Sequence, residues 1–401
     1  MTLNRRKTLA IGAAAVAAPY LNTVYAQAKK EVKLGQTMPY SGPASAYGTI
    51  GKLHQAFFKK VNAEGGVNGA MVNLISLDDG YSPPKTVEQI RRLVEQDNVD
   101  ALFQTLGTPS NSAIHKYVNA KKIPHLFVAT GATKWNDAKN YPWTFGFNLS
   151  YQTEGEIYAK YILKNRPNAK IAILYQNDDY GKDVLAGVEN VLKGDKAKMI
   201  VARATYEVTD PTVDSQILTL KASGADTFIN ITTPKFAAQA IRRVYDSGWK
   251  PPLNIVNNVG ASVGSVLTPA GLDKSVDVIT VQYYKDESDP TWKDDPAMLE
   301  WRAFMGKHYT EGNVLDASNV YAYITANLML QTLKQCNGNY SKDNIKKAAE
   351  SIKNWKHGLL LPGISVNTSA TDHAPIDQAQ LSKFDGKKWV LFGEVLGGGA
   401  G

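Results

Sequence analysis

The amino-acid sequence predicts an α/β protein of two similar lobes, each a doubly wound parallel sheet with helices on both faces. The chain has 401 residues, which is more than one hydrophobic core usually serves. Strand-like and helix-like segments alternate along it, the pattern of a parallel sheet covered by helices. This alternation runs through one set and then starts again, which favours two lobes over one long sheet.

The first set lies between residues 31 and 130. Leu53, Phe57 and Val61 follow one another at intervals of four and mark one apolar face of a helix. A glycine-rich turn at 65–69 then ends that helix. The expected strands are 31–38, 71–77, 101–106 and 123–130, and the expected helices are 52–62, 86–96 and one between the last two strands.

The second set begins after residue 169. We expect strands at 170–176, 199–206, 226–232 and 253–257, and helices at 181–193, 215–223 and 235–247. A further strand is expected at 276–284 and a long apolar-rich helix at 317–335. The glycine-rich residues 397–401 are expected to form a disordered tail.

The N-terminus predicts a cleaved export signal over residues 1–28. Arg5, Arg6 and Lys7 precede a weakly apolar run at 9–18, and small residues end in Ala26-Gln27-Ala28. The apolar run is shorter than the roughly 20 residues that span a bilayer. We expect cleavage after Ala28, with Ala26 as the second choice; an amphipathic first helix of the mature protein is the alternative.

The export route stays open. Arg5-Arg6 resembles a twin-arginine signal, but Thr8 stands where that motif prefers an apolar residue. Either route implies a periplasmic protein.

The positive charge does not indicate a nucleic-acid partner. The formal net charge is +8, but residues 1–28 contain three basic residues and no acid, which leaves +5 over residues 29–401. Beyond residue 28 no Lys/Arg cluster is interleaved with aromatics, as a nucleic-acid site requires. No later run of 18 or more apolar residues occurs, so we expect no membrane anchor there.

Motifs of several common enzyme classes are missing from the sequence. There is no Walker loop, H-E-x-x-H helix or dinucleotide glycine fingerprint. The six histidines never stand three or four residues apart, and the single Cys336 is expected to be an inert buried thiol. We therefore expect no enzyme, no cofactor and no metal.

Polar loops at the carboxyl ends of expected strands are the candidate site, because open α/β sheets bind ligands there. Thr108 suits an N-cap and Pro109 the first helical position, so a helix starting there would direct free N–H groups at a carboxylate. The alternative is an ordinary helix start. Gly131 permits close backbone approach to a ligand. Asp78-Asp79 and Asp178-Asp179 also follow strands and are expected to form turns or cap helices.

Several motifs appear in one order along the chain. They are Pro39-Tyr40-Ser41-Gly42-Pro43 with Tyr47-Gly48, the 65–69 turn, Asp78-Asp79-Gly80, and Gln176-Asn177-Asp178-Asp179-Tyr180-Gly181. Together they resemble the periplasmic solute-binding proteins of branched-chain (hydrophobic) amino acid ABC importers, the leucine/isoleucine/valine-binding type.

This resemblance implies a type I periplasmic binding protein fold, in which two lobes joined by three chain crossings close on the ligand by a hinge. It places one lobe at 29–147 plus 281–376 and the other at 148–280 plus 377–396. The crossings are expected near 146–148, 280–281 and 376–378.

The resemblance also implies a carboxylate site. Thr108 falls on the hydroxyl residue that holds the ligand carboxylate in the amino-acid-binding relatives. Ala129 falls on a residue that contributes its backbone carbonyl. Gly131 falls on a second hydroxyl position, so that side chain is missing, although Thr130 is adjacent.

The rest of the implied site departs from these relatives. Tyr47 and Tyr180 match tyrosines that pack against the ligand, whereas Thr233 replaces an aromatic residue. Where the relatives pair an acid with the ligand's ammonium, this chain has Asn257 and Asn258. A buried charge without its partner costs about 3–5 kcal/mol, so acids without an α-amine, aromatic or otherwise apolar, are favoured. The alternative is that Asp178 or Asp179 supplies the missing charge.

We therefore interpret the chain as a solute receptor that captures a small carboxylate, a hydrophobic amino acid or an aromatic acid, and delivers it to an ABC permease in the inner membrane. We expect a monomer. A ligand-sensing receptor domain and an exported hydrolase are the alternatives.

Overall fold

The computed structural model describes residues 31–397. The expected export signal at 1–28 and residues 398–401 of the expected tail lie outside the described residues. Gly397, which we assigned to that tail, is instead the last residue of a strand.

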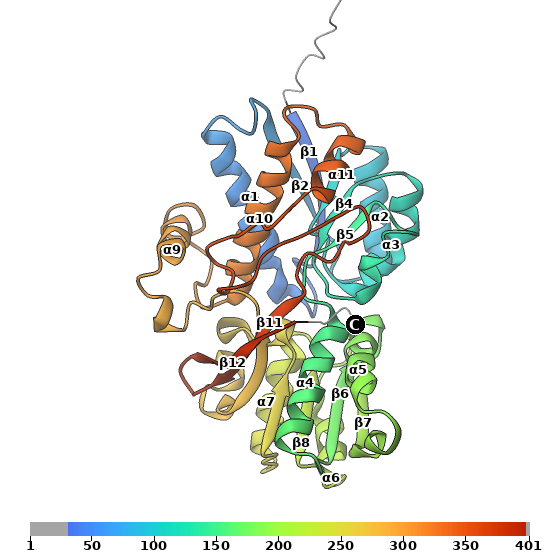
Figure 1. The fold of residues 1–401 in the computed structure, drawn as a ribbon, viewed down its shortest axis with the longest axis vertical. Helices are drawn as coiled ribbons and strands as arrows, with labels where there is room; N and C mark the ends of the chain where they lie inside the picture. The colour runs from blue at the N-terminus through green and yellow to red at the C-terminus, as the bar shows by residue number, and fades with distance from the viewer. Residues whose placement is uncertain (1–30, 398–401) are drawn as a thin grey trace, which may run out of the picture.

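Two sheets form the centres of two lobes, one above the other in Figure 1. The first sheet is parallel, in the order β2-β1-β3-β4-β5. Its strands are β1 (Glu31–Met38), β2 (Met71–Asp78), β3 (Ala101–Phe103), β4 (His125–Val128) and β5 (Thr144–Gly146). β3 is shorter than expected because Gln104 has a φ of 54°, which ends the extended conformation.

The second sheet has the order β12-β11-β10-β9-β8-β6-β7. The strands β6 to β10 pair in parallel, whereas β11 and β12 are antiparallel additions. The strands are β6 (Ile171–Gln176), β7 (Ile200–Tyr206), β8 (Thr227–Ile231), β9 (Leu253–Val256), β10 (Val278–Gln282), β11 (Gln378–Phe384) and β12 (Trp389–Gly397).

Helices cover both faces of each sheet. On the first sheet α1 and α10 pack together on one face, and α2 and α3 on the other; on the second, α4 and α5 lie opposite α6 and α7. The helices of the first lobe are α1 (Gly48–Ala63), α2 (Pro83–Glu95), α3 (Thr108–Ala120), α9 (Pro296–His308), α10 (Ala317–Gln335) and α11 (Lys342–Glu350). Those of the second are α4 (Tyr151–Asn165), α5 (Asp179–Val191), α6 (Asp214–Ala222), α7 (Pro234–Asp246) and the short α8 (Thr268–Ala270).

The chain passes between the lobes after β5, after β10 and before β11. β10 continues to Gln282, two residues beyond the boundary expected at 280. The predicted two-lobe α/β class is confirmed, and so are the expected strands at 31–38 and 71–77 and the helix at 317–335. Helices and strands that we did not anticipate are α4, α8, α9, α11, β5, β11 and β12.

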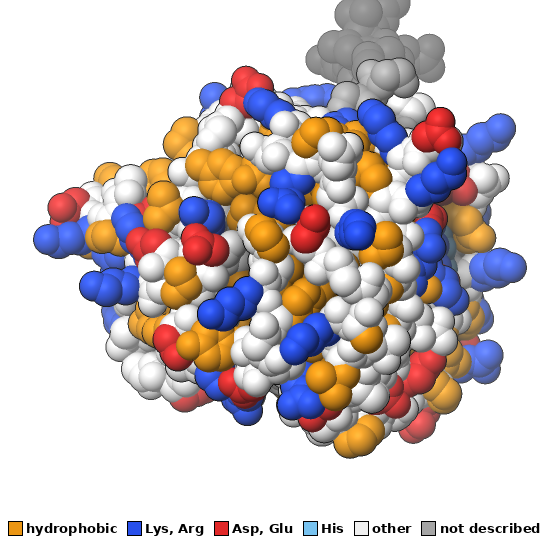
Figure 2. Space-filling model, turned by 90° about the horizontal axis from the view of Figure 1, so that it is seen from below, with side chains coloured by type: hydrophobic (Ala, Val, Ile, Leu, Met, Phe, Trp, Pro, Cys, Tyr) orange, Lys and Arg blue, Asp and Glu red, His pale blue; other side chains and the backbone are white. Residues whose placement is uncertain are grey.

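Cys336 is a buried free thiol whose pKa burial raises to about 11, as expected for an inert residue. Residues 31–397 contain no helix of sufficient length and apolar character to cross a membrane. Figure 2 views the molecule from the end of the second lobe and shows Lys and Arg side chains interspersed with Asp and Glu. This face therefore carries no concentrated basic patch of the kind that binds nucleic acid.

Candidate ligand-binding site between the lobes

A cavity lies between the lobes, where the carboxyl ends of the strands in the two sheets face one another. The space between its lining residues is about 800 Å³, counting its open mouth. Six of the nine residues that the sequence suggested line it: Tyr47, Thr108, Ala129, Tyr180, Thr233 and Asn258. Thr130, Gly131 and Asn257 do not.

The N-terminus of α3 opens into this cavity. Gly107, not Thr108, is the N-cap, and Thr108 and Pro109 are the first two helical residues, which corrects our assignment by one position. Gly107 has a φ of 98°, and a Cβ there would lie 2.5 Å from the Tyr81 ring, so glycine is required. Amides of the first helical turn lack partners within the helix and carry the positive end of its dipole. This end of the cavity can therefore bind an anion.

Thr130 lies behind Thr108 and orients it. The two hydroxyl oxygens are 2.5 Å apart. Thr130 Oγ1 also accepts from the Ala132 N–H at 3.3 Å and from Trp135 Nε1 at 3.4 Å. Because that oxygen is already an acceptor, its own proton is free to be donated to Thr108. The Thr108 hydroxyl proton then remains available to a ligand.

Ala129 lines the cavity, and its carbonyl accepts the Gly107 N–H at 3.3 Å. Gly131 lies against the chain segment at the hinge and does not line the cavity, which corrects the ligand-approach role that we gave it. A Cβ on Gly131 would lie 2.4 Å from the Leu149 carbonyl oxygen and 2.7 Å from the Tyr151 ring. The missing side chain therefore lets the loop after β4 pass close to the chain that enters the second lobe.

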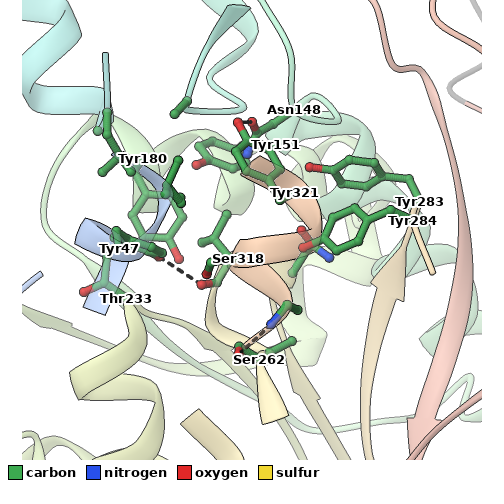
Figure 3. Close-up of a pocket in the computed structure, with 18 of the residues that line it drawn as sticks. Tyr47, Asn148, Tyr151, Tyr180, Thr233, Ser262, Tyr283, Tyr284, Ser318 and Tyr321 are labelled. Carbon is green, nitrogen blue, oxygen red and sulfur yellow. Dashed lines mark hydrogen bonds between the residues drawn. The ribbon is translucent and has the colours of Figure 1, made fainter. Parts of the chain in front are cut away.

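Tyr47, Tyr180 and Thr233 lie together on one side of the cavity (Figure 3). The Tyr47 hydroxyl donates to the Val259 carbonyl at 2.9 Å and thereby joins the two lobes. The Tyr180 hydroxyl donates to Asn257 Oδ1 at 2.8 Å. Burial raises the pKa of both tyrosines well above the usual value, so both stay neutral donors.

The loop after β9 presents neutral amides. Asn257 is fully buried behind Tyr180 and does not reach the cavity. Asn258 lines it, but its Nδ2 donates to the Val281 carbonyl at 2.7 Å. Its backbone N–H donates to Glu154 Oε1 at 2.6 Å, which anchors the loop on α4.

Glu154 is a buried carboxyl in the first turn of α4. Its Oε1 also accepts the Tyr158 hydroxyl at 2.6 Å. Burial outweighs these hydrogen bonds and raises the pKa of Glu154 from 4.5 to about 7.

Asp178 and Asp179 do not line the cavity. Asp178 caps α5 by accepting the Tyr180 N–H at 2.9 Å and the Gly181 N–H at 3.3 Å. Asp179 accepts from Lys134 Nζ at 2.5 Å, and this hydrogen bond lowers the pKa of its carboxyl. The expectation of a helix-capping acid is confirmed for Asp178. Asp78 accepts the Tyr40 and Gly80 N–H groups and forms a turn, also as expected.

Sequence reasoning missed much of the lining. The missed polar residues are Tyr81, Asn148, Tyr151, Ser262, Gln282, Tyr283, Tyr284, Asp286, Ser318 and Tyr321. Tyr283 and Tyr284 end the expected strand 276–284, so the strand-end argument could have found them. Tyr321 lies inside a helix, where no local signal points to a site.

Further contacts join the two lobes. Asp316 Oδ1 accepts from the Ser262 hydroxyl at 2.9 Å and from the Ser265 hydroxyl at 3.2 Å. Lys134 of the first lobe and Asp179 of the second form the ion pair described above. Together with the Tyr47–Val259 bond, these contacts define a closed arrangement.

The cavity provides hydroxyls, amides, aromatic rings and the carboxylate of Asp286, and none of its lining residues within the described range is Lys, Arg or His. Residues 31–397 also contain no group of three or more His, Cys, Asp or Glu side chains able to hold a metal ion. The arrangement suits the enclosure of a small ligand by two lobes.

A family model described as "Periplasmic binding protein" matches residues 31–388. The chain belongs to this family. It is thus a solute-binding protein with the type I periplasmic binding protein fold, and the family is a class of binding proteins, not of enzymes.

Several known proteins resemble this periplasmic binding protein along most of its length. "Leu/Ile/Val-binding protein homolog 7" of Brucella suis biovar 1 (strain 1330) is 23% identical over 338 residues, which are 82% of each chain. A branched-chain amino acid ABC transporter protein from Thermus thermophilus with bound valine has a TM-score of 0.82 at 14% identity, covering 92% of this chain and 97% of that one. A fatty acid ABC transporter substrate-binding protein from Thermomonospora curvata has a TM-score of 0.77 at 20% identity, covering 92% and 93%. At these sequence identities, the similarity to the solved structures concerns the fold alone.

Proposed function

We propose that this protein is the receptor of an ABC importer and captures a small apolar or aromatic carboxylate that has no α-amino group. The closed lobes enclose the ligand, and the closed form delivers it to an inner-membrane permease. A ligand that touches both lobes stabilises the closed state by its differential affinity for that state. We further propose that residues 1–28 direct export to the periplasm and that the receptor is a monomer.

The carboxylate preference is supported by the N-terminus of α3, where Thr108, the first helical residue, lines the cavity. This is an anion site of the kind that helix N-termini provide. The names of the relatives agree with this preference. One is named for leucine, isoleucine and valine and another for a fatty acid, and a carboxylate is the group that these ligands share.

The exclusion of an α-amine follows from the groups near this site. An α-ammonium nitrogen is bonded to the carbon next to the carboxylate, two bonds from the carboxylate carbon, so its partner must lie close to Thr108. Asn257 and Asn258 are neutral, Asp178 caps α5, and Asp179 is paired with Lys134. Burying an unpartnered ammonium costs about 3–5 kcal/mol, which is more than a hundredfold in affinity.

Matched ligand pairs test this preference. Leucine is compared with isocaproate, its analogue without the amino group, and phenylalanine with phenylpropanoate, by thermal shift and calorimetry. A ligand at a hundredfold excess over its Kd stabilises the protein by about 2.7 kcal/mol. We expect the analogues without the amine to bind more tightly. Tighter binding of leucine than of isocaproate would contradict the proposal.

Thr108→Val tests the carboxylate site. The substitution keeps the shape and removes one hydrogen bond to a charged group, worth about 1.5–3 kcal/mol, so every carboxylate ligand should bind at least about tenfold more weakly. Thr332→Val is the matched control, since Thr332 is buried in α10 and its hydroxyl donates to the Leu328 carbonyl away from the cavity. Unchanged affinity in Thr108→Val would remove Thr108 from the site.

A further inference from the structure

One carboxylate lines the cavity without a counter-charge. Asp286 is 4% exposed and belongs to the segment that follows β10. Its Oδ1 accepts the Ser288 N–H at 2.8 Å and the Ser288 hydroxyl. Its Oδ2 has no hydrogen-bond partner among residues 31–397.

The charged residues around Asp286 are already paired. Lys285 forms an ion pair with Asp295 at 2.5 Å, Glu287 with Arg302 at 2.8 Å, and Asp289 with Lys388 at 3.2 Å. Asp286 has no such partner in the described part of the chain. A buried carboxylate is costly unless it receives hydrogen bonds, so its free oxygen is an acceptor that a ligand can use.

Asp286 belongs to the end of the cavity remote from the α3 N-terminus. The Ser112 hydroxyl lies 2.7 Å from the Thr108 carbonyl oxygen and 3.2 Å from Asp179 Oδ2, which places Thr108 on the side of Tyr180. Figure 3 shows Tyr180 and Tyr284 on opposite sides of the cavity, with Tyr321 between them. Asp286 follows Tyr284 by two residues.

The strand order gives the scale of this separation. Tyr180 follows β6 and Tyr284 follows β10, and β8 and β9 lie between those strands. Three steps of about 4.8 Å between neighbouring strands amount to about 14 Å before the side chains extend inward. A second unpartnered polar atom, the buried Tyr283 hydroxyl, also belongs to the end near β10.

We propose that Asp286 binds a hydrogen-bond donor, a hydroxyl or amino group, on the end of the ligand opposite its carboxylate. The ligand class is then an acid with a polar group at each end and an apolar or aromatic middle. This inference rests on the proposed function, because it takes the α3 N-terminus as the carboxylate site. On this inference, Asp286 discriminates between ligands with and without the distal hydrogen-bond donor.

Two pairs of acids test this choice by calorimetry: para-hydroxyphenylpropanoate with phenylpropanoate, and para-hydroxybenzoate with benzoate. A hydrogen bond to a buried carboxylate should favour the hydroxylated member about tenfold or more in at least one pair. Asp286→Asn should reduce that preference to about threefold or less. Binding of the unsubstituted acid by the variant shows that it is folded.

Asp289→Asn is the matched control. Asp289 is a buried carboxylate of the same segment that accepts the Thr291 N–H and pairs with Lys388, but it does not line the cavity. The preference for the hydroxylated acid should persist in this variant. Equal affinity of the wild type for both members of each pair, or an Asp286→Asn variant that keeps the preference, overturns the role of Asp286 and leaves the proposed function standing. Binding of leucine but of none of the four acids overturns the proposed function, and this inference with it.

Discussion

The buried carboxyl of Glu154 makes the stability of this protein depend on pH in a direction that can be worked out. Burial raises its folded-state pKa from 4.5 to about 7. Between these values the folded state binds the proton that the unfolded state has released, so the free energy of unfolding falls as pH rises. The contribution is fully present below about pH 4.5 and is lost as the pH passes through 7. Each pH unit between the two pKa values is worth about 1.4 kcal/mol, so the loss amounts to about 3 kcal/mol.

Glu154→Gln isolates this effect. The amide oxygen of Gln can still accept from the Tyr158 hydroxyl and the Asn258 N–H, but the side chain does not ionise. The unfolding entropy of about 2.1 cal/mol/K per residue gives about 0.8 kcal/mol/K for a chain of this size. The variant should therefore gain about 4 °C in Tm relative to the wild type as the pH is raised from about 5 to about 8.

The assay is differential scanning calorimetry of both proteins across that pH range. Glu156→Gln is the control, because Glu156 lies on the same helix with its side chain 31% exposed and pairs with Lys160. Its Tm difference from the wild type should not grow with pH. A Tm difference between Glu154→Gln and the wild type that stays constant within about 1 °C from pH 5 to 8 would refute the reasoning.

Two further predictions concern the contacts that hold the lobes together. Tyr47→Phe removes the hydrogen bond to the Val259 carbonyl and should weaken ligand binding by about 1–2 kcal/mol, or roughly 5- to 30-fold, as measured by calorimetry. The control is Tyr175→Phe, which lies outside the cavity and should bind the ligand as the wild type does. Lys134→Met breaks the ion pair with Asp179, whose side chains are 38% and 57% exposed. An exposed pair contributes at most about 1 kcal/mol, so affinity should fall about fivefold or less at low salt and hardly at all at about 0.5 M salt. An effect of Lys134→Met that is independent of salt would contradict an electrostatic role.

The alternation of strands and helices could be predicted because the buried strands consist of continuous apolar residues and the helices of the first lobe carry regular aliphatic stripes. The helix α4 gave no such stripe. It packs on α5 through glycines: a Cβ on Gly155 would lie 2.2 Å from the Val184 carbonyl oxygen, and one on Gly187 would lie 2.1 Å from that of Gln152. Because the two helices approach each other where glycines have no side chain, this contact leaves no periodic pattern of apolar residues in the sequence. β12 was missed because most of its residues are partly or fully exposed.

Some residues of the candidate site could likewise be predicted from the sequence, and others could not. Thr108 and Ala129 could be placed because each follows a strand at the edge where α/β sheets bind ligands. Thr130 and Gly131 come directly after Ala129 but point elsewhere, because the chain turns away from the cavity toward the hinge. Tyr151, Tyr321 and Asp286 enter the cavity from segments far apart in sequence, and only the closed arrangement of the lobes brings them together.

The contacts between the lobes and the contacts with the ligand should affect binding in different ways. If only a fraction of the molecules is closed in the absence of ligand, the apparent Kd is the intrinsic Kd divided by that fraction. Loss of the Lys134–Asp179 pair lowers the fraction and should therefore weaken every ligand by the same factor. Loss of the Asp286 carboxylate acts on one end of the ligand and should change the ratio of affinities within a pair of acids. Comparing Lys134→Met and Asp286→Asn on the same acids thus distinguishes residues that stabilise the closed lobes from residues that determine ligand specificity.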